Sequence, residues 1–580
     1  MLVSFRHGQH IPITDGQEET DCSSFDYFFK TAAEAEFGEG TLLALDAVHQ
    51  DMVESDDPSD KNHSSLPPIF TYFGQFVDHD ITGLSQRDDA APLPEIDGPF
   101  EPQSRNHVLA KLINTRTGRF DLDSLYGSER DTGNASLNKL NGLLRFPKDR
   151  AMMWIGTYGN LDRRVRFPEN DPGGDLLRLD HLLKTGAFTE GDIEALPAAH
   201  RALFMHPDGS LNRSRAIIAD ARNDENLFIA QLHLAFLRFH NRVVQEWPHA
   251  RKAGDENEVF EWARHQVRLY YQWLVLNIWL PAICDPKVVR EILSDGPKLY
   301  DALLNQCHWN QGDPLPMPLE FATACFRFGH SMVRGTYDWN ENFGRGPSPL
   351  IPSGAAFEFM FLFTGSVPKS AGDPANGIPP REPMGGNGPK LPGNWGADWD
   401  RLVHPLSQFA DRSTRRIDTV LADPLTRMEN EKPNPIARNL LARNVRRGFL
   451  HNLPTAQSAI NGLEALGMSF RKLTKAEICS GRTSGEIKSG GFDDETPLWF
   501  YTLKEAELLG SGQHLGPLGS HIVAGTIIGL ILRGPNPVWE TPGSHEGRWH
   551  PVDGPRVSGQ LVDSFPALLR AALLMENPDH

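Results

Sequence analysis

The stretch Thr71–Thr82 (TYFGQFVDHDIT) constrains the fold of this chain more than any other. On a helix, which turns about 100° per residue, Gln75 and His79 share one face with Asp78 close by, and the apolar side chains gather opposite. Asp80 falls among those apolar residues, where an isolated carboxylate would be very costly. The stretch therefore predicts a helix with an amide and an imidazole on one side and, on the other, a carboxylate that needs a cation. Taken alone, an Asp-His-Asp triplet is more often a surface or satisfied core group than a catalyst, so a functional role depends on the rest of the chain.

The composition is that of an ordinary globular protein. Of the 580 residues, 39% are hydrophobic and 23% are charged, which is enough to bury a large core. The net charge of −18 argues against nucleic acid or an anionic membrane as the main partner. The five cysteines are scattered and lack CxxC spacing. A disulfide scaffold or a structural zinc site is therefore excluded as the organising principle.

The sequence also bears on the compartment. The opening residues lack a basic region followed by an apolar segment, so no standard secretory signal is expected. The longest apolar run, Ile522–Leu532, is too short to span a bilayer. We expect a soluble chain without a transmembrane segment, either cytoplasmic or exported by a non-standard route.

Periodicity along the chain predicts a mostly α fold with little β structure, because few stretches alternate with period two. We expect an acidic N-terminal arm (1–60), one large helical domain (61–545) and a C-terminal extension packed on that domain (546–580). A Pro/Gly-rich stretch, 366–398, is expected to be a long loop. No internal repeat, Rossmann glycine fingerprint, P-loop or GxSxG elbow is found. Six runs carry helical patterns: residues 227–244, 257–280, 321–333, 434–463, 497–509 and 516–532.

A second polar segment, Asn114–Gly127, follows the first. Its Thr117, Asp121 and Asp123 side chains alternate in a Gly-containing loop, a spacing that suits a hard cation. The segment is not an EF-hand, because its length and glycine position differ and no glutamate closes it. A polar turn that caps the next helix is the equally weighted alternative. Asp80 would supply a further carboxylate, which would make a calcium site tied to the Gln75/His79 helix.

Three more residues attract attention at buried helices. Arg222 and Glu225 stand three apart at the start of the interior helix around 227–244, where a buried role is more probable than the usual surface ion pair. His330 lies on the apolar side of the run 321–333, where a packed core histidine is commoner than a metal ligand. The pattern alone does not assign either site a function.

Six blocks taken together resemble one family, the animal-type haem peroxidases of the peroxidase–cyclooxygenase superfamily, which includes myeloperoxidases, peroxinectins and many bacterial members. The similarity runs from about residue 60 to about residue 540, and the order and spacing of the blocks make it specific. The blocks are GQFVDHD (74–80), TGRFDLDSLYGSE (117–129), ADARNDE (219–225), LRFHNR (237–242), FRFGH (326–330) and RNVRRGFLHNLP (443–454).

The resemblance implies a single mostly α domain around a b-type haem. His330 then matches the proximal ligand of the haem iron, and Asn444 matches the group that accepts a hydrogen bond from its other ring nitrogen. Arg327 and Arg447 match residues that contact the haem propionates.

The distal side and the cation site are implied in the same way. His79 matches the distal histidine, Gln75 lies one helical turn away, and Arg222 matches the distal arginine. Through a ferryl haem intermediate, such an enzyme reduces H2O2 and oxidises halides, thiocyanate or phenolic donors, a chemistry associated with the response to oxidative stress. A neutral imidazole can move the peroxide proton, and a guanidinium can stabilise the leaving oxygen. The calcium ligands are matched by Asp80, Thr117, the carbonyl of Arg119, Asp121 and Asp123.

Two departures from the family pattern refine this expectation. In mammalian members two carboxylates ester-link the haem, and Asp78 and Glu225 occupy the matching positions, so covalent attachment is possible here. The sulfonium-forming methionine of myeloperoxidase is replaced by Asn226. We therefore predict no sulfonium bond and a lower reduction potential, which weakens the case for chloride oxidation.

A second departure separates the subfamilies. Cyclooxygenases and fatty-acid dioxygenases carry a radical-forming tyrosine three residues before the proximal histidine, and this chain has Arg327 there. A peroxidase is thus favoured over a lipid dioxygenase, unless Tyr337 or Tyr72 lies over the haem edge. Two further alternatives are an adhesion-type binding protein with a weak site and a non-haem metal hydrolase built on residues 78–80. The motifs define neither the physiological donor nor the oligomeric state.

Overall fold

The computed structural model describes most of the chain. Residues 366–389 of the Pro/Gly-rich stretch, most of the first 22 residues, and Glu129 of the second block lie outside the described residues. The described residues are 11–12, 23–32, 40–55, 63–87, 92–127, 131–159, 172–206, 209–346, 349, 351–352, 354–364, 390–404, 412–428, 434–535 and 537–575.

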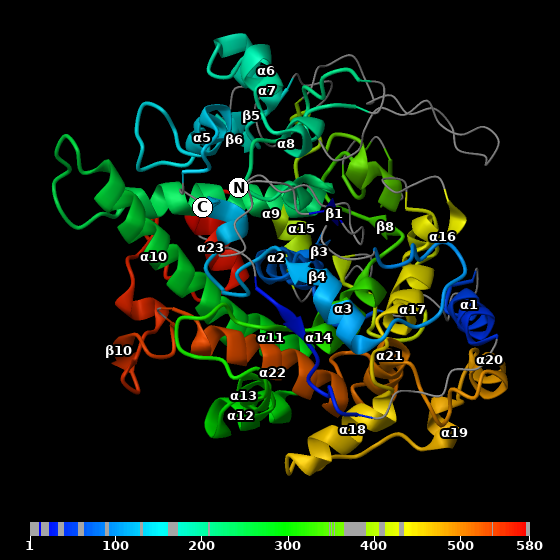
Figure 1. The fold of residues 1–580 in the computed structure, drawn as a ribbon. Coiled ribbons are helices and arrows are strands. Elements are labelled where there is room, and N and C mark those ends of the chain that lie inside the picture. The colour runs from blue at the N-terminus through cyan, green and yellow to red at the C-terminus, as the bar shows by residue number, and fades with distance from the viewer. Residues whose placement is uncertain are drawn as a thin grey trace.

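The prediction of a mostly α fold is confirmed, because helices make up most of the described structure (Figure 1). The α-helices of ten or more residues are α1 (Thr41–Asp51), α2 (Ile69–Ile81), α9 (Leu227–Gln245), α10 (Glu256–Leu274), α12 (Pro286–Asp295), α17 (Leu440–Leu450), α18 (Ala456–Ala465), α21 (Leu498–Leu509) and α22 (Pro517–Arg533). Shorter α-helices are α3 (Arg105–Lys111), α4 (Asp123–Tyr126), α5 (Ala135–Gly142), α6 (Leu179–Thr185), α7 (Glu190–Glu194), α8 (Ala198–Ala202), α11 (Leu280–Ile283), α13 (Lys298–Gln306), α14 (Leu319–Thr323), α15 (Trp399–Val403), α16 (Pro435–Arg438), α19 (Lys475–Ile478), α20 (Ser484–Ser489) and α23 (Phe565–Ala571).

Strands are short and form only small sheets in the described part of the chain. In the largest sheet, β3 pairs in parallel with β1 and antiparallel with β4, with Ser85 opposite Ile113. Parallel β2–β7, antiparallel β5–β6 and antiparallel β8–β9 form the other sheets. The strands are β1 (Ile11–Pro12), β2 (Phe25–Asp26), β3 (Leu84–Gln86), β4 (Leu112–Asn114), β5 (Gly156–Thr157), β6 (Pro172–Asp175), β7 (Met317–Pro318), β8 (Thr336–Tyr337), β9 (Ala355–Ala356) and β10 (Pro542–His545).

Helix α2 lies near the middle of the molecule, with longer helices around it (Figure 1). Its apolar face is buried as the sequence predicts: Phe76 stacks on Phe236 of α9 at 4.8 Å between ring centroids, and Phe73 meets Tyr271 of α10 edge-on. Such aromatic pairs add to the stability that burial of their surface provides. This packing holds the opposite, polar face of α2 in a fixed orientation.

The predicted helix over 321–333 has a different form in the structure. Helix α14 ends at Thr323, and a 3-10 helix, η5 (Cys325–Met332), carries His330. The two are separated at Ala324, whose backbone angles (φ −130°, ψ −78°) are not helical. This break gives η5 its own direction, so His330 is not presented along the axis of α14.

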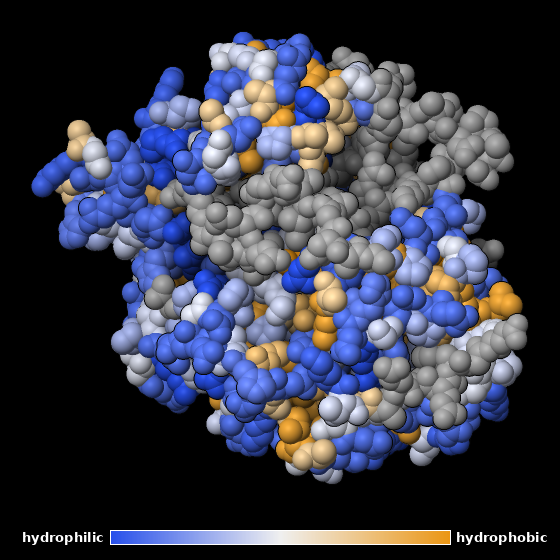
Figure 2. Space-filling view, viewed as in Figure 1, coloured by the Kyte–Doolittle hydropathy of each residue, from blue (hydrophilic) through white to orange (hydrophobic). Residues whose placement is uncertain are grey.

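The face of the molecule in Figure 2 is mainly hydrophilic, with scattered apolar patches. Among the helices that the structure describes, none combines the length and the apolar character needed to cross a bilayer.

Glu505 of α21 places a buried carboxyl at the start of α22, and this carboxyl makes the stability of the fold depend on pH. Both carboxyl oxygens of Glu505 accept hydrogen bonds from the amides of Leu518 and Gly519, each at 3.2 Å. Burial raises the pKa of Glu505 to about 8, from 4.5 for an ordinary glutamate. Between these two pH values the folded chain holds a proton that the unfolded chain has released, so stability falls as the pH rises.

We expect Glu505→Gln to flatten the pH dependence of stability between pH 5 and pH 8, since the amide cannot titrate. One proton corresponds to about 1.4 kcal/mol per pH unit. Unfolding midpoints of the two proteins at both pH values measure the difference. Parallel pH profiles for the two proteins would contradict this role of Glu505.

Candidate active site

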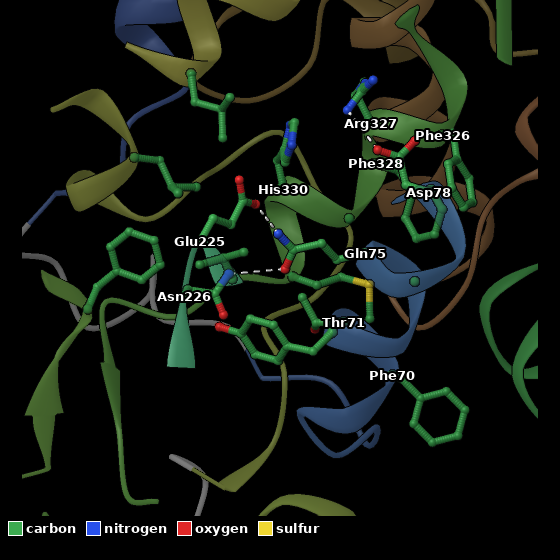
Figure 3. Close-up of a pocket in the computed structure, with 18 of the residues that line it drawn as sticks. Phe70, Thr71, Gln75, Asp78, Glu225, Asn226, Phe326, Arg327, Phe328 and His330 are labelled. Carbon is green, nitrogen blue, oxygen red and sulfur yellow. Dashed lines mark hydrogen bonds and ion pairs between the residues drawn. The ribbon is translucent and has the colours of Figure 1, made fainter. Parts of the chain in front are cut away.

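A cavity lies beside α2 and η5. Its walls are mainly aromatic and aliphatic, including Phe326, Phe328 and Phe357. The polar residues in its lining come from α2, from the segment before α9 and from η5, and Figure 3 shows how they lie. These polar residues are Thr71, Gln75, Asp78, Glu225, Asn226, Arg327 and His330.

On the η5 side, His330 lines the cavity and contacts Asn444 of α17, as the sequence predicts. The orientation differs from the prediction, because the amide nitrogen of Asn444, rather than its oxygen, lies 2.8 Å from Nδ1 of His330. The Asn444 oxygen is buried without a hydrogen-bond partner among the described residues. Rotation of this amide by 180° keeps its shape and lets the oxygen accept a hydrogen bond from Nδ1–H, which leaves Nε2 of His330 for a metal.

At another edge of the cavity, Arg327 pairs with Asp78 at 3.3 Å. Asp78 also accepts a hydrogen bond from the hydroxyl of Thr82 at 2.8 Å. Arg447, predicted at the same edge, is buried within α17 and is not part of the described lining. Arg327 is therefore the better placed of the two arginines to bind an anionic group in the cavity.

On the α2 side, Gln75 lies between Glu225 and Asn226 (Figure 3). Its amide nitrogen donates to Oε1 of Glu225, and its amide oxygen accepts from Nδ2 of Asn226 at 3.2 Å. His79 is fully buried behind this layer, with Nε2 3.9 Å from Oε1 of Glu225. The structure thus brings Gln75, His79 and Glu225 together, with Gln75 and Glu225 nearest the cavity.

Arg222 contacts this group through the backbone carbonyls at the end of α2. Its guanidinium pairs with Asp220 and donates to the carbonyl oxygens of His79 and Thr82, at 2.9 and 2.8 Å. Like His79, it is not part of the described cavity lining. Burial, and to a lesser extent the positive charge of Arg222, lower the pKa of His79 to about 4. His79 is therefore neutral at pH 7 and can accept a proton.

A cluster of carboxylates lies on the far side of α2. Carboxylate oxygens of Asp80, Asp121 and Asp123 all lie within 4.8 Å of one another. Oδ2 of Asp80 is buried and has no hydrogen-bond partner among the described residues. Burial raises the pKa of Asp80 well above its ordinary value, and the two neighbouring carboxylates act in the same direction. The predicted convergence of Asp80 with the second polar segment is therefore present.

Two further residues of the second polar segment, Thr117 and Arg119, contact each other. The backbone amide of Arg119 donates to the hydroxyl of Thr117 at 3.2 Å. Arg116 links the cluster to the α2 side of the cavity, because its guanidinium pairs with both Asp123 and Asp220.

Asn223 is the functional candidate that the sequence reasoning missed. It lies in a 3-10 helix, η3 (Ala221–Asp224), and contacts the imidazoles of both His79 and His233. Its position directly after Arg222 was the available signal. No spacing rule places a residue of η3 against α2, because this contact is tertiary.

Comparison with known proteins confirms the family resemblance. Residues 177–359 match the model of the animal haem peroxidase family, a segment that contains Arg222, Glu225, Arg327 and His330. A peroxidase-like protein from Margaritifera margaritifera is 26% identical over 284 residues, which is 47% of this chain and 32% of that protein. Mouse thyroid peroxidase is 25% identical over 292 residues, 47% of this chain and 29% of that protein.

A solved structure shows the same fold. Peroxidase A from Dictyostelium discoideum superposes with a TM-score of 0.51 at 15% identity, covering 95% of this chain and 92% of that chain. By sequence and by fold, the chain is similar to the animal haem peroxidases. It matches about a third of the length of the first curated relatives.

Proposed function

We propose that this chain is a haem peroxidase that reduces H2O2 and oxidises small donors. The observation that carries the proposal is the placement of two histidines about one cavity. His330 lines one side of it, and His79 stands behind Gln75 and Glu225 on another. Family similarity to peroxidases supports the same assignment.

The residues present fit a haem group. With the Asn444 amide rotated, Nε2 of His330 would hold the haem iron, and the aromatic walls would suit a porphyrin. Asp78 and Glu225 both line the cavity, where they would be available for ester links to the haem. Arg327 would hold a propionate at the edge. The haem, when bound, supplies the redox chemistry by accepting oxidising equivalents from peroxide and passing them to donors.

The chain's own residues handle the proton and the charge. Neutral His79 takes a proton from peroxide at Nε2 and returns it to the departing oxygen as water forms. The Gln75 amide, between Glu225 and Asn226, orders the polar layer in front of His79. Arg222 holds the backbone at His79, and its positive charge lies behind the cavity lining, paired with Asp220. Without a methionine at position 226, we expect bromide, iodide, thiocyanate or phenols rather than chloride as donors.

A panel of donors tests this function. Haem-loaded protein is mixed with H2O2 and each of bromide, iodide, thiocyanate and a phenol, and donor oxidation is followed. We expect turnover with at least one donor. Tyr72 lines the cavity and hydrogen-bonds Tyr337, so a fatty acid with O2 belongs in the same panel. Oxygen uptake with the fatty acid and no donor oxidation would instead indicate a dioxygenase.

We further propose that the carboxylate cluster binds Ca²⁺. All of its groups are oxygen donors, as hard cations require, and the unpartnered Asp80 oxygen needs a positive partner. Asp121, Asp123, the Thr117 hydroxyl and the Arg119 carbonyl would complete the ligand set. Haem esters and calcium are both properties that mass spectrometry and metal analysis of the purified protein measure directly.

Adding Ca²⁺ to EDTA-treated protein is expected to raise its thermal unfolding midpoint. A ligand present at 100 times its Kd stabilises the folded state by about 2.7 kcal/mol. Asp123→Asn should abolish the shift, whereas Asp400→Asn, at a carboxyl that is 40% exposed, should retain it. Equal shifts in wild type and Asp123→Asn would show that the ion binds elsewhere.

A further inference from the structure

We propose that Asn223 is the positioning residue that sets the tautomer and the ring orientation of His79. The inference rests on the proposed peroxidase function. It concerns a contact between η3 and α2, and no single sequence block above contains both residues of this contact. Asn223 and His79 are both fully buried, so the contact between them is not shared with solvent.

With the Asn223 amide oriented as in the structure, the contact assigns the proton of His79 to one ring nitrogen. Oδ1 of Asn223 lies 2.9 Å from Nδ1 of His79. A carbonyl oxygen only accepts hydrogen bonds, so Nδ1 of His79 must be the donor. In the neutral ring, Nε2 then holds the lone pair. Nε2 is the nitrogen that lies 3.9 Å from Glu225, on the side of the cavity lining.

The nitrogen end of the Asn223 amide contacts a second histidine. Nδ2 of Asn223 lies 3.0 Å from Nδ1 of His233 on α9. An amide nitrogen only donates, so His233 accepts at Nδ1 and carries its proton on Nε2. His233 is fully buried, and its ring packs against Phe76 of α2. A reversed Asn223 amide would place two donors or two acceptors face to face unless both histidines changed tautomer.

The consequence is a line of three side chains, His233–Asn223–His79, that ends at the nitrogen needed for proton transfer. The backbone of His79 is held separately, since Arg222 donates to its carbonyl oxygen. Asn223 therefore controls the ring and Arg222 the main chain. The opposite side of the cavity has a comparable device, because Asn444 contacts Nδ1 of His330.

The test uses two variants of Asn223 that differ in one property. Asn223→Asp keeps an oxygen that accepts from Nδ1–H of His79, whereas Asn223→Leu has similar size and accepts nothing. Tyr300→Phe serves as the control for loss of a buried hydrogen bond. Tyr300 is on α13, and its hydroxyl donates to the Pro316 carbonyl at 2.9 Å. Thermal midpoints and haem content of all variants are recorded first.

Two readouts follow. In haem-free, ¹⁵N-histidine-labelled protein at neutral pH, the His79 signals are assigned by their loss in His79→Ala. We expect Nδ1 to be protonated in wild type and Asn223→Asp, and Nε2 to become protonated in Asn223→Leu. In haem-loaded protein, we expect Asn223→Leu to react with H2O2 about 10²-fold more slowly than wild type. Asn223→Asp and Tyr300→Phe should stay within about tenfold of wild type.

The outcomes separate this inference from the proposed function. A folded, haem-loaded Asn223→Leu that keeps the Nδ1–H tautomer, or reacts with H2O2 at the wild-type rate, overturns the role of Asn223. Should Asn223→Leu fail to fold, an Nε2-protonated His79 in wild type or in Asn223→Asp overturns it equally. If wild-type protein does not react with H2O2 at all, the peroxidase function fails, while the NMR readout still decides the tautomer.

Discussion

Replacing His79 with alanine is expected to slow the reaction of the haem-loaded chain with H2O2 by about 10²- to 10⁴-fold, the usual contribution of a general acid–base group. The physical reason is that the neutral imidazole, with its pKa lowered to about 4 by burial, is the base nearest the Gln75/Glu225 layer. Stopped-flow absorbance at varied H2O2 concentration gives the second-order rate constant.

His249→Ala is the matched control for this prediction. His249 is an exposed histidine whose ring contacts Trp247 and lies outside the candidate site. Its variant should react at the wild-type rate and bind haem normally. An unchanged rate in His79→Ala would show that another group transfers the proton, and Glu225 would then be the first to replace.

The second large effect is expected at His330. His330→Ala should lose axial ligation of the haem iron, because His330 is the histidine among the described cavity-lining residues. Haem titration followed by absorbance should show weak binding and an altered ferric spectrum. Replacement of Asn444, which contacts Nδ1 of His330, should cost about 10- to 100-fold in haem-iron affinity or activity, as is usual for groups that orient a metal ligand.

External imidazole provides the control for His330→Ala. If the histidine acts only as a ligand, imidazole added to the variant should restore a histidine-like spectrum. Full-strength haem ligation in His330→Ala without imidazole would contradict the assignment.

Local sequence patterns were sufficient for the framework of the site. The 3.6-residue period of α2 placed Phe73 and Phe76 in the core and Gln75 and His79 on the opposite face. In the structure both phenylalanines are buried, Gln75 lines the cavity and His79 is buried behind it. The cost of burying Asp80 alone predicted a nearby group of compatible chemistry, and Asp121 and Asp123 lie beside it. These inferences succeed because helix periodicity and charge burial act on neighbouring residues or on single side chains.

Contacts between separate elements were not predictable in this way. Asn223 reaches His79 only because η3 folds against α2, and the pairing of Arg222 with Asp220 depends on the same packing. The 3-10 helix η5 follows a non-helical residue, Ala324, and apolar periodicity reveals neither feature. Family motifs supplied the identities of the site residues, while the structure supplied their relative positions.

The wild-type chain allows the most direct test of whether His330 ligates a single haem and His79 makes that haem react with H2O2. Haem b is titrated into haem-free protein, and the complex is then mixed with H2O2 in a stopped-flow spectrometer. We predict saturation at one haem per chain, a ferric histidine-ligated spectrum, a rapid spectral change with H2O2 and its reversal by a donor. Absence of saturable haem binding, or a bound haem that H2O2 leaves unchanged, would contradict the proposed function.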